Sequence, residues 1–297
     1  MSSPMQGIII KGVGGFYEVQ AEGVLHTCRA RGKFRRDGLT PLPGDQVEFS
    51  PGSGEELGFV DKILPRRNAL KRPAVANVDT LVLVTAAASP EPDLRLVDKL
   101  LVAARPLDMA VLLVINKCDL APAAAVQAIA AEYAGAVSAV LPMSAKTGLG
   151  RDALLERLAG RRCCLAGQSG VGKSSILNCL FPDRNLETGS VSHKTERGRH
   201  TTRHAELLPM PGGGLVADTP GFSLMEVEPM DPALLPSCWP EFAPFASECR
   251  FSGCLHDAEP GCAVKQAVAS GAIPAGRHAR YREILSETRE KWRNRYD

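Results

Sequence analysis

The hydrophobic positions of the chain follow two different patterns, and the change comes near residue 70. Before it, short apolar stretches alternate with polar positions and are broken by glycine and proline, as in β-strands joined by turns. The expected strands are 7–10, 16–20, 24–29, 45–49 and 59–64. Five short strands in so few residues predict a small barrel, and an OB-fold is the architecture that they fit best.

Beyond residue 70, continuous apolar runs alternate with segments of helical period. The expected buried strands are 80–86, 111–115, 137–141 and 162–166, and the expected helices are 94–104, 121–133 and 150–158. This alternation predicts a mostly parallel α/β sheet with right-handed crossovers. Residues 65–73, between the two patterns, are expected to form a basic linker, and residues 275–296 a basic terminal helix.

One basic cluster lies in a loop or strand edge of the predicted barrel and consists of Lys33, Phe34, Arg35 and Arg36. Such a cluster could follow a phosphate backbone while the phenylalanine stacks on a base. It could equally be a solvated basic loop on a structural barrel, and the sequence leaves both interpretations open. The same choice, a salt-bridged solvated helix or an RNA contact, applies to the terminal helix.

The overall charge does not indicate a nucleic-acid partner, because 35 basic and 33 acidic residues leave a formal net charge of only +2. A nucleic-acid surface would therefore have to come from local clustering. No signal peptide is apparent and the apolar runs are too short to cross a bilayer, so a soluble, cytoplasmic protein without membrane contact is expected. Nine cysteines in a reducing compartment favour metal ligands or free thiols over a disulfide framework.

A glycine-rich loop gives the strongest chemical signal. Residues 167–174 have the sequence G-x-x-x-x-G-K-S and lie between an expected strand and an expected helix. The backbone N–H groups of such a loop and the helix N-terminus can hold a triphosphate. Lys173 would reach the β- and γ-phosphates, and the Ser174 hydroxyl would bind Mg²⁺. The predicted nucleotide-binding residues of this loop are Gly167, Gln168, Ser169, Gly170, Val171, Gly172, Lys173, Ser174 and Ser175.

A second motif predicts which base is bound. Asn116, Lys117 and Asp119 form N-K-x-D directly after the apolar run 111–115, at the strand end where ligands of such sheets bind. The Asp119 carboxylate can accept from both the N1–H and the exocyclic amine of guanine, whereas adenine does not offer that pair of donors. The motif therefore selects GTP over ATP. Asn116 would hold neighbouring loops and the base, and the stem of Lys117 would pack along it.

A weaker motif follows the next apolar run and consists of Ser144, Ala145 and Lys146. The Ala145 N–H could meet guanine O6. The alternative is a simple helix cap at Ser144 or Thr147. The position one strand–helix unit after N-K-x-D favours the guanine contact.

The remaining phosphate-side motif is D-x-x-G, after the expected strand 215–217. It would place Asp218 just outside the ligands of Mg²⁺ and the Gly221 N–H near the γ-phosphate. A polar loop, 188–203, precedes it, and one threonine of this loop should contact Mg²⁺ and the γ-phosphate together. We favour Thr202, with Thr201 as the close alternative.

A possible metal centre lies in the last quarter of the chain. Cys249, Cys254, His256 and Cys262 have the spacing C-x4-C-x-H-x5-C. Three thiolates and an imidazole make a closed tetrahedral Zn²⁺ site, and four protein ligands leave no open position, so the zinc would be structural. The spacing differs from the common C-x2-C pair, and unrelated buried cysteines beside a surface histidine are the alternative.

Together these motifs resemble those of a GTPase in rotated order, with the guanine readers ahead of the phosphate loop. N-K-C-D, S-A-K, G-Q-S-G-V-G-K-S, G-R-H-T-T-R and D-T-P-G-F are similar to the motifs of the circularly permuted GTPases of ribosome assembly. The motifs closely resemble those of the small-ribosomal-subunit-dependent GTPase A family. The resemblance covers nearly the whole chain, and the cysteine–histidine spacing followed by Ala-Val looks like the zinc module of that family.

The resemblance implies three domains: an RNA-binding OB-fold in 1–70, a permuted GTPase domain in 71–225 and a helical zinc-binding domain in 226–297. It implies GTP or GDP, Mg²⁺ and one structural Zn²⁺ as ligands, and the small ribosomal subunit with its rRNA as partners. The implied activity is GTP hydrolysis, stimulated by the small subunit, as a checkpoint in late maturation. A monomer is expected. A GTP-gated RNA-binding module and a GTP-dependent RNA-modifying or metal-handling protein are the alternatives.

The water-positioning group is the open point of the predicted mechanism. Phe222 follows D-T-P-G, where Ras-like enzymes carry the glutamine that orients the attacking water. A phenyl ring cannot do this, so slow intrinsic hydrolysis is expected. His200 is one candidate, although a solvent-facing histidine or an RNA contact is the alternative; Lys173 and Thr202 complete the predicted catalytic residues. Because the chain runs from D-x-x-G directly to the zinc module, the γ-phosphate could bias the position of that module.

Overall fold

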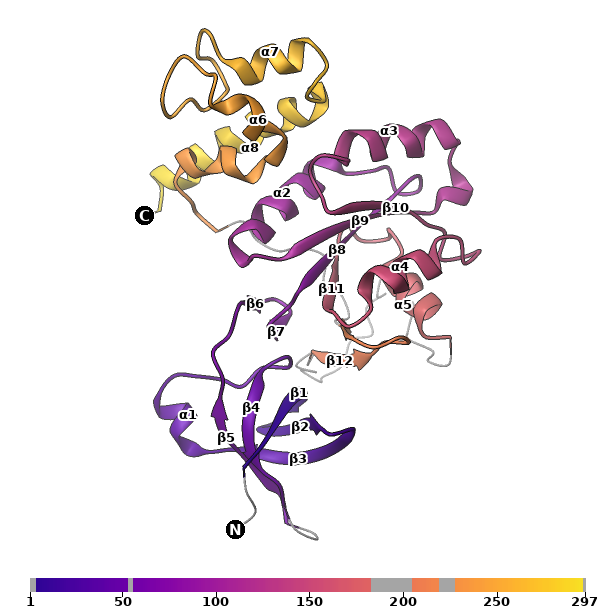
Figure 1. Ribbon diagram of the computed structural model, residues 1–297, viewed down its shortest axis with the longest axis vertical. Helices are drawn as coiled ribbons and strands as arrows, with labels where there is room; N and C mark the ends of the chain where they lie inside the picture. Colours follow the sequence, from indigo (N-terminus) through magenta and orange to yellow (C-terminus); the bar gives the residue numbers. More distant parts are fainter. Residues whose placement is uncertain (1–3, 53–55, 183–204, 219–227, 296–297) are drawn as a thin grey trace, which may run out of the picture. The chain divides into compact units, whose positions relative to one another are not determined.

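The computed structural model describes residues 4–52, 56–182, 205–218 and 228–295. They form two compact units. The first takes its residues from 1–81, 152–165 and 174–222, and the second from 82–151, 166–173 and 223–297. Strands and helices carry the labels of Figure 1.

The first unit contains a five-stranded barrel, as the sequence predicted. Neighbouring strands follow the order β1-β2-β3-β5-β4, and β4 pairs back onto β1, which closes the barrel. Buried residues alternate along β2 and β4 and build a core that includes Val19, Val47 and Phe49. This strand order, with a helix between β3 and β4, is that of an OB-like barrel. The strands are β1 (Met5–Val13), β2 (Phe16–Ala21), β3 (Val24–Ala30), β4 (Gln46–Ser50) and β5 (Gly58–Ile63).

The basic cluster of the barrel does not lie in a loop. Residues Gly32–Arg36 form the short helix α1. One turn of helix directs Phe34 into the barrel core, where it is only 5% exposed, while Lys33 and Arg36 remain exposed. The expectation that Phe34 could stack on a base is therefore wrong, because its ring is part of the core.

The stretch expected as a basic linker includes β6 (Ala69–Lys71), which forms a hairpin with β7 (Ala74–Ala76) just beyond it. Before it, Arg66 Nε donates to Oδ1 of the buried Asp45 at 2.7 Å, and Arg67 Nη2 donates to Asp79 Oδ1 at 2.7 Å. These carboxylates stand 21 and 12 positions away in the sequence. The arginines thus hold local structure together, and a local sequence pattern could not reveal their partners.

The rest of the first unit is a small sheet with two helices. Strand β11 (Arg162–Ala166) pairs in parallel with β13 (Leu215–Asp218), and β12 (Glu206–Pro209), which the sequence did not predict, pairs antiparallel to β13. Glu206 lies opposite Lys11 of the barrel, and Lys11 Nζ donates to its carboxylate at 2.8 Å. The helices are α4 (Arg151–Leu158) and α5 (Lys173–Leu180).

The second unit carries the strand order β10-β9-β8. All residues of β8 are buried, and β10 pairs in parallel with β9, with Val140 opposite Leu113. Alternating apolar strands and helices confirm the α/β prediction for this region. The elements are β8 (Thr80–Ala86), α2 (Leu94–Ala104), β9 (Ala110–Asn116), α3 (Ala123–Tyr133) and β10 (Ala139–Pro142).

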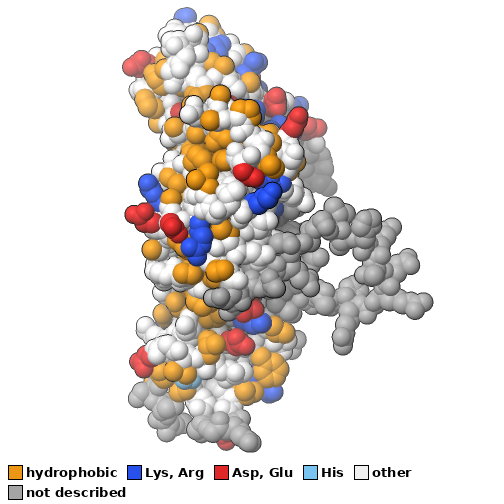
Figure 2. Space-filling model, turned by 90° about the vertical axis from the view of Figure 1, so that its right-hand side faces the viewer, with side chains coloured by type: hydrophobic (Ala, Val, Ile, Leu, Met, Phe, Trp, Pro, Cys, Tyr) orange, Lys and Arg blue, Asp and Glu red, His pale blue; other side chains and the backbone are white. Residues whose placement is uncertain are grey.

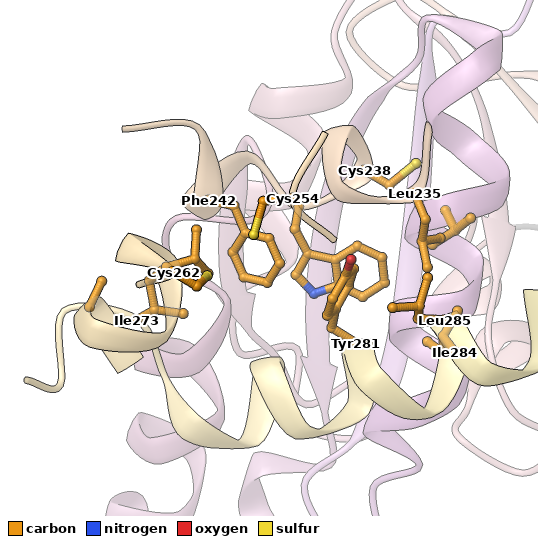
Figure 3. Close-up of a cluster of buried hydrophobic side chains, with 13 residues drawn as sticks. Leu235, Cys238, Phe242, Cys254, Cys262, Ile273, Tyr281, Ile284 and Leu285 are labelled. Carbon is orange, nitrogen blue, oxygen red and sulfur yellow. The ribbon is translucent and has the colours of Figure 1, made fainter. Parts of the chain in front are cut away.

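The C-terminal part of the second unit is helical, with α6 (Ala243–Ala246), α7 (Ala263–Ala269) and α8 (Ala275–Arg293). Its core joins aromatic side chains to the sulfur atoms of the cysteine cluster (Figure 3). Trp239 and Phe242 pack against Tyr281 of α8 with ring centroids 5.0 Å apart in both pairs, edge to face. Burial of such rings contributes much of the stability of a module this small.

Helix α8 is not the mainly solvated helix that its composition allowed. Asp98 of α2 is fully buried and accepts hydrogen bonds from Arg277 Nη1, from Arg280 Nε at 2.6 Å and from the Tyr133 hydroxyl at 2.7 Å. Arg277 is also fully buried, and its Nε donates to Glu241 at 2.7 Å. These five residues form the Asp98 network, which fastens the C-terminal helices to α2 and α3.

Charged residues of α8 also form ion pairs with α2. Glu283 and Glu287 of α8 form ion pairs with Arg95 and Lys99 of α2. On the face seen in Figure 2, basic and acidic side chains lie close to one another rather than in a patch of one sign. No helix in the part of the chain that the structure describes has the length and apolar character needed to span a membrane.

Candidate functional site

The phosphate loop joins β11 to α5 in the predicted way. Gly167, Gly170 and Gly172 have φ values of 144°, 80° and 98°. Residues with a Cβ adopt such φ values only with strain. A Cβ on Gly167 would lie 2.0 Å from the Val84 carbonyl oxygen. Glycine at this position therefore allows the loop backbone to pass directly over strand β8.

Lys173 points back into the loop. Its Nζ donates to the carbonyl oxygens of Gly167 at 2.7 Å and Gln168 at 2.9 Å. Burial lowers the pKa of Lys173 to about 8, because the charged ammonium is partly removed from water. A nearby phosphate would reverse that shift, so the ammonium is well suited to an anionic ligand.

Asn116 connects three of the predicted loops. Its side chain is 1% exposed. The amide Nδ2 donates to the Val171 carbonyl of the phosphate loop at 2.8 Å, and Oδ1 accepts from the Ala145 N–H at 3.0 Å. One carboxamide thus holds the phosphate loop, N-K-x-D and S-A-K together. The Ala145 N–H, for which we predicted a contact with guanine O6, is engaged by Asn116 here.

The neighbouring residues of N-K-x-D extend this arrangement. Lys117 has φ of 63° and donates through Nζ to the Gly170 carbonyl at 2.7 Å and to the Ser89 carbonyl. Asp119 is exposed, and no residue that the structure describes donates a hydrogen bond to its carboxylate. The carboxylate of Asp119 therefore remains able to accept from a ligand. Sequence reasoning missed Ser89, because a backbone carbonyl leaves no signature in the sequence.

The S-A-K segment shows features of both interpretations. Ser144 is fully buried and its Oγ accepts from the Thr147 N–H at 3.3 Å, which is a local capping bond. The Cys118 N–H donates to the Met143 carbonyl at 3.1 Å and fixes this segment beside N-K-x-D. Lys146 is exposed. Ser144 thus caps its own turn, and the same segment lies beside the candidate base site.

The magnesium and γ-phosphate side is described only in part. Ser174 and Ser175 are exposed in the first turn of α5, and Asp218 ends β13, the parallel neighbour of the strand that leads into the phosphate loop. Parallel neighbours end at the same edge of a sheet. His200, Thr201, Thr202, Gly221 and Phe222 lie outside the described residues, so their assigned roles stay predictions.

The cysteine cluster has the geometry of a zinc site. The four candidate ligand atoms lie within 4.8 Å of one another. Cys249 and Cys262 sulfurs are 3.8 Å apart, and they lie 3.6 and 3.4 Å from His256 Nδ1. A tetrahedron with metal–sulfur bonds of about 2.3 Å and metal–nitrogen bonds of about 2.0 Å has edges of roughly 3.5 to 3.8 Å. The donor set and its spacing therefore fit one structural Zn²⁺.

Residues around the cluster orient the ligands, and the sequence did not reveal them. His278 Nε2 of α8 hydrogen-bonds to the carbonyl oxygen of His256 at 2.8 Å. The Glu259 carboxylate accepts from the N–H groups of Leu255 and Asp257, on either side of His256, at 3.0 and 2.9 Å. Such supporting bonds fix the direction of metal ligands.

Comparison with known proteins gives the family. Residues 63–228 match the family model described as RsgA GTPase, and residues 6–60 match the model described as RsgA N-terminal domain. The chain is 46% identical over 287 residues to a Ruminiclostridium cellulolyticum protein named small ribosomal subunit biogenesis GTPase RsgA, with 96% of this chain and 94% of that protein covered. A Moorella thermoacetica protein of the same name is 45% identical, covering 95% of this chain and 97% of that protein.

Solved structures agree in fold. YjeQ from Thermotoga maritima matches with a TM-score of 0.84 and 35% identity over 96% of this chain and 99% of that one. YloQ, described as a circularly permuted GTPase, matches with a TM-score of 0.81 and 36% identity over 97% and 96%. The rotated motif order predicted from the sequence is therefore a property of the fold. The chain belongs to the RsgA GTPase family, whose members hydrolyse GTP and use Mg²⁺.

Proposed function

We propose that this GTPase acts in biogenesis of the small ribosomal subunit, as a cytoplasmic, monomeric late-maturation checkpoint that binds rRNA and is stimulated by the subunit. The name of the relatives supports the first part, because they are described as small ribosomal subunit biogenesis GTPases. The single observation that carries the nucleotide assignment is the Asn116 side chain, which bonds the phosphate loop and S-A-K at once.

In the proposed site, each group of the chain has a distinct task. The Asp119 carboxylate accepts from the guanine N1–H and amine, and the Lys173 ammonium neutralises charge on the β- and γ-phosphates. Ser174 and Thr202 are the proposed Mg²⁺ ligands, with Asp218 beside them. When bound, Mg²⁺ would offset the charge that builds up on the phosphate oxygens during hydrolysis.

The proposed domain organisation follows the sequence: an rRNA-binding barrel in 1–70, the permuted GTPase domain in 71–225 and the zinc-binding domain in 226–297. The GTP state would hold the segments around Thr202 and Gly221 and so favour the arrangement that fits the small subunit. Hydrolysis would release them. The slow intrinsic rate expected from Phe222 makes such a step dependent on the partner, and His200 is the candidate water-positioning group.

The test is GTP hydrolysis measured alone, with small subunits and with large subunits at equal concentration. We expect stimulation by small subunits only. Asp119→Asn provides the matched control, since it should remove GTP turnover in all three conditions without touching the ribosome-binding surfaces. Equal turnover with and without small subunits would refute the proposal. The nucleotide-dependent arrangement has its own test. It would be refuted if the protein bound small subunits with equal affinity in the presence of GDP and of a non-hydrolysable GTP analogue.

A further inference from the structure

Two exposed phenylalanines lie in one row across the outside of the barrel. In the strand pairings, Val13 of β1 is opposite Phe16 of β2, Phe16 is opposite Arg29 of β3, and Arg29 is opposite Phe59 of β5. Phe16 is 42% exposed and Phe59 is 41% exposed. Adjacent strands are about 4.8 Å apart, so the two rings stand on strands roughly 10 Å apart with a guanidinium between them. We call Phe16, Arg29, Arg31 and Phe59 the stacking row.

Each ring of the stacking row has an arginine above it. The Arg29 guanidinium carbon lies 4.8 Å from the centroid of Phe16, and that of Arg31 lies 5.0 Å from the centroid of Phe59. Asp61 accepts a hydrogen bond from Arg31 and another from the Ser50 hydroxyl, so Arg31 is held in place. The contacts order the rings before any partner arrives, which reduces the entropy lost on binding.

The row is not needed to build the barrel. The aromatic side chains that fill the core, Tyr17, Phe34 and Phe49, are all buried, whereas the row faces outward. The positive charge of the row comes from Arg29, because Arg31 is paired with Asp61. Arg29 forms no ion pair with any residue that the structure describes. An outward row of flat rings and guanidinium groups therefore offers surfaces for stacking and positive charge for phosphates.

We propose that the stacking row binds unstacked bases of a single-stranded RNA segment, one base on Phe16 and one on Phe59, with Arg29 facing the phosphates and Arg31 holding the ring of Phe59 in place. This inference rests on the proposed function, which supplies an RNA partner. Bases stack on aromatic and guanidinium planes without regard to sequence, and each stacked base is worth a large gain in affinity. Paired bases in a duplex do not expose these faces. Phe16 is the first residue of β2 and Phe59 the second residue of β5, next to the turns that carry ligands in OB-type barrels.

The experiment measures binding of the full-length protein to two labelled RNA probes, an unstructured oligoribonucleotide of about ten nucleotides and a duplex of the same composition. We expect Phe16→Ala and Phe59→Ala each to weaken single-strand binding about tenfold and to leave duplex binding unchanged. Phe16→Tyr should retain affinity, since it keeps the ring. Leu25→Ala is the matched control, because Leu25 is 58% exposed on the same barrel and lies outside the row.

A second readout reports stacking directly. The two tryptophans of the chain are Trp239 and Trp292, so Phe59→Trp places a new fluorophore in the barrel. Its emission should be quenched by the single strand and not by the duplex. Unchanged single-strand affinity of both alanine variants, or equal losses for single strand and duplex, would overturn the proposal. Normal oligonucleotide binding combined with weaker binding to whole subunits would also overturn it and assign the row to a protein partner.

The proposed function is judged separately, from GTP hydrolysis by the unaltered protein with and without small subunits. Phenylalanine-dependent binding of the single strand without subunit stimulation would refute the proposed function and leave the stacking row standing. Stimulation of hydrolysis by subunits, together with unaltered RNA binding by the alanine variants, would support the proposed function and refute the stacking row.

Discussion

Replacing Asp98 with Asn should destabilise the C-terminal half of the second unit more than any surface change. The substitution keeps the shape of the side chain and removes the charge that faces Arg277 and Arg280. Asp98 and Arg277 are both 0% exposed, so the guanidinium would be left with Glu241 as its one carboxylate partner among the described residues. Breaking one side of a buried ion pair costs about 3–5 kcal/mol. For a protein of this size that is a fall in melting temperature of about 6–20 °C.

The assay is urea and thermal unfolding of the full chain, followed by tryptophan fluorescence. Trp239 is 1% exposed and lies under the Arg277 guanidinium, with 5.3 Å between the guanidinium carbon and the ring centroid, so its emission reports on this region. Glu283→Gln is the control, because Glu283 pairs with Arg95 across the same helices but is 57% exposed. The Glu283→Gln change should lower the free energy of unfolding by less than about 1 kcal/mol.

A double variant separates the charge from the packing. Removing Asp98 and Arg277 together, as Asp98→Leu with Arg277→Met, takes away both fully buried charges and should recover part of the stability lost in Asp98→Leu, although Glu241, which is 10% exposed, then loses its partner Arg277. If Asp98→Asn costs no more than Glu283→Gln, or if the two single changes simply add, the Asp98 network does not stabilise the molecule in the way described.

Four further outcomes are expected. Asn116→Ala removes both bonds that hold the loops and should weaken GDP binding about 10- to 100-fold in a fluorescent-nucleotide titration; unchanged affinity would contradict the role of the carboxamide. Asp119→Asn should shift preference toward xanthine nucleotides, and retained GTP preference would rule out the assignment. With a pKa of about 8 for Lys173, the protonated fraction falls between pH 7 and 8.5, so GDP affinity should fall about fourfold; a flat profile would argue against an ammonium–phosphate contact. Cys254→Ser should release bound zinc, measured by metal analysis, and lower the stability reported by Trp239.

The sequence predicted those parts of the fold that depend on local pattern. Strands β8 and β9 are continuous apolar runs, and β2 and β4 of the barrel alternate buried with exposed or half-buried residues, so the residue pattern alone predicts their burial. Helix α1 was missed because a single buried residue, Phe34, gives no helical period. Strand β12 was missed because it is short and pairs across the chain with β13 and β1.

For the site, the glycine loop and the zinc ligands could be found because their spacing is fixed by chemistry. The supporting contacts could not be found. The pairing of Asp98 with Arg277 spans 179 positions, and the bond from Lys117 to the Ser89 carbonyl involves a backbone atom. Neither has a local signature. The same holds for the stacking row, in which three neighbouring strands bring together residues that look unrelated in the sequence.

The Asn116 carboxamide has a consequence for how such a chain can evolve. The loops that would read the base and hold the phosphates are fastened by side-chain bonds through space, from Asn116 to Val171 and to Ala145. Such bonds do not depend on the order in which the loops follow one another in the sequence. New termini can therefore be opened elsewhere in the sheet while the pocket keeps its geometry, and the permuted order needs no compensating change at the pocket itself.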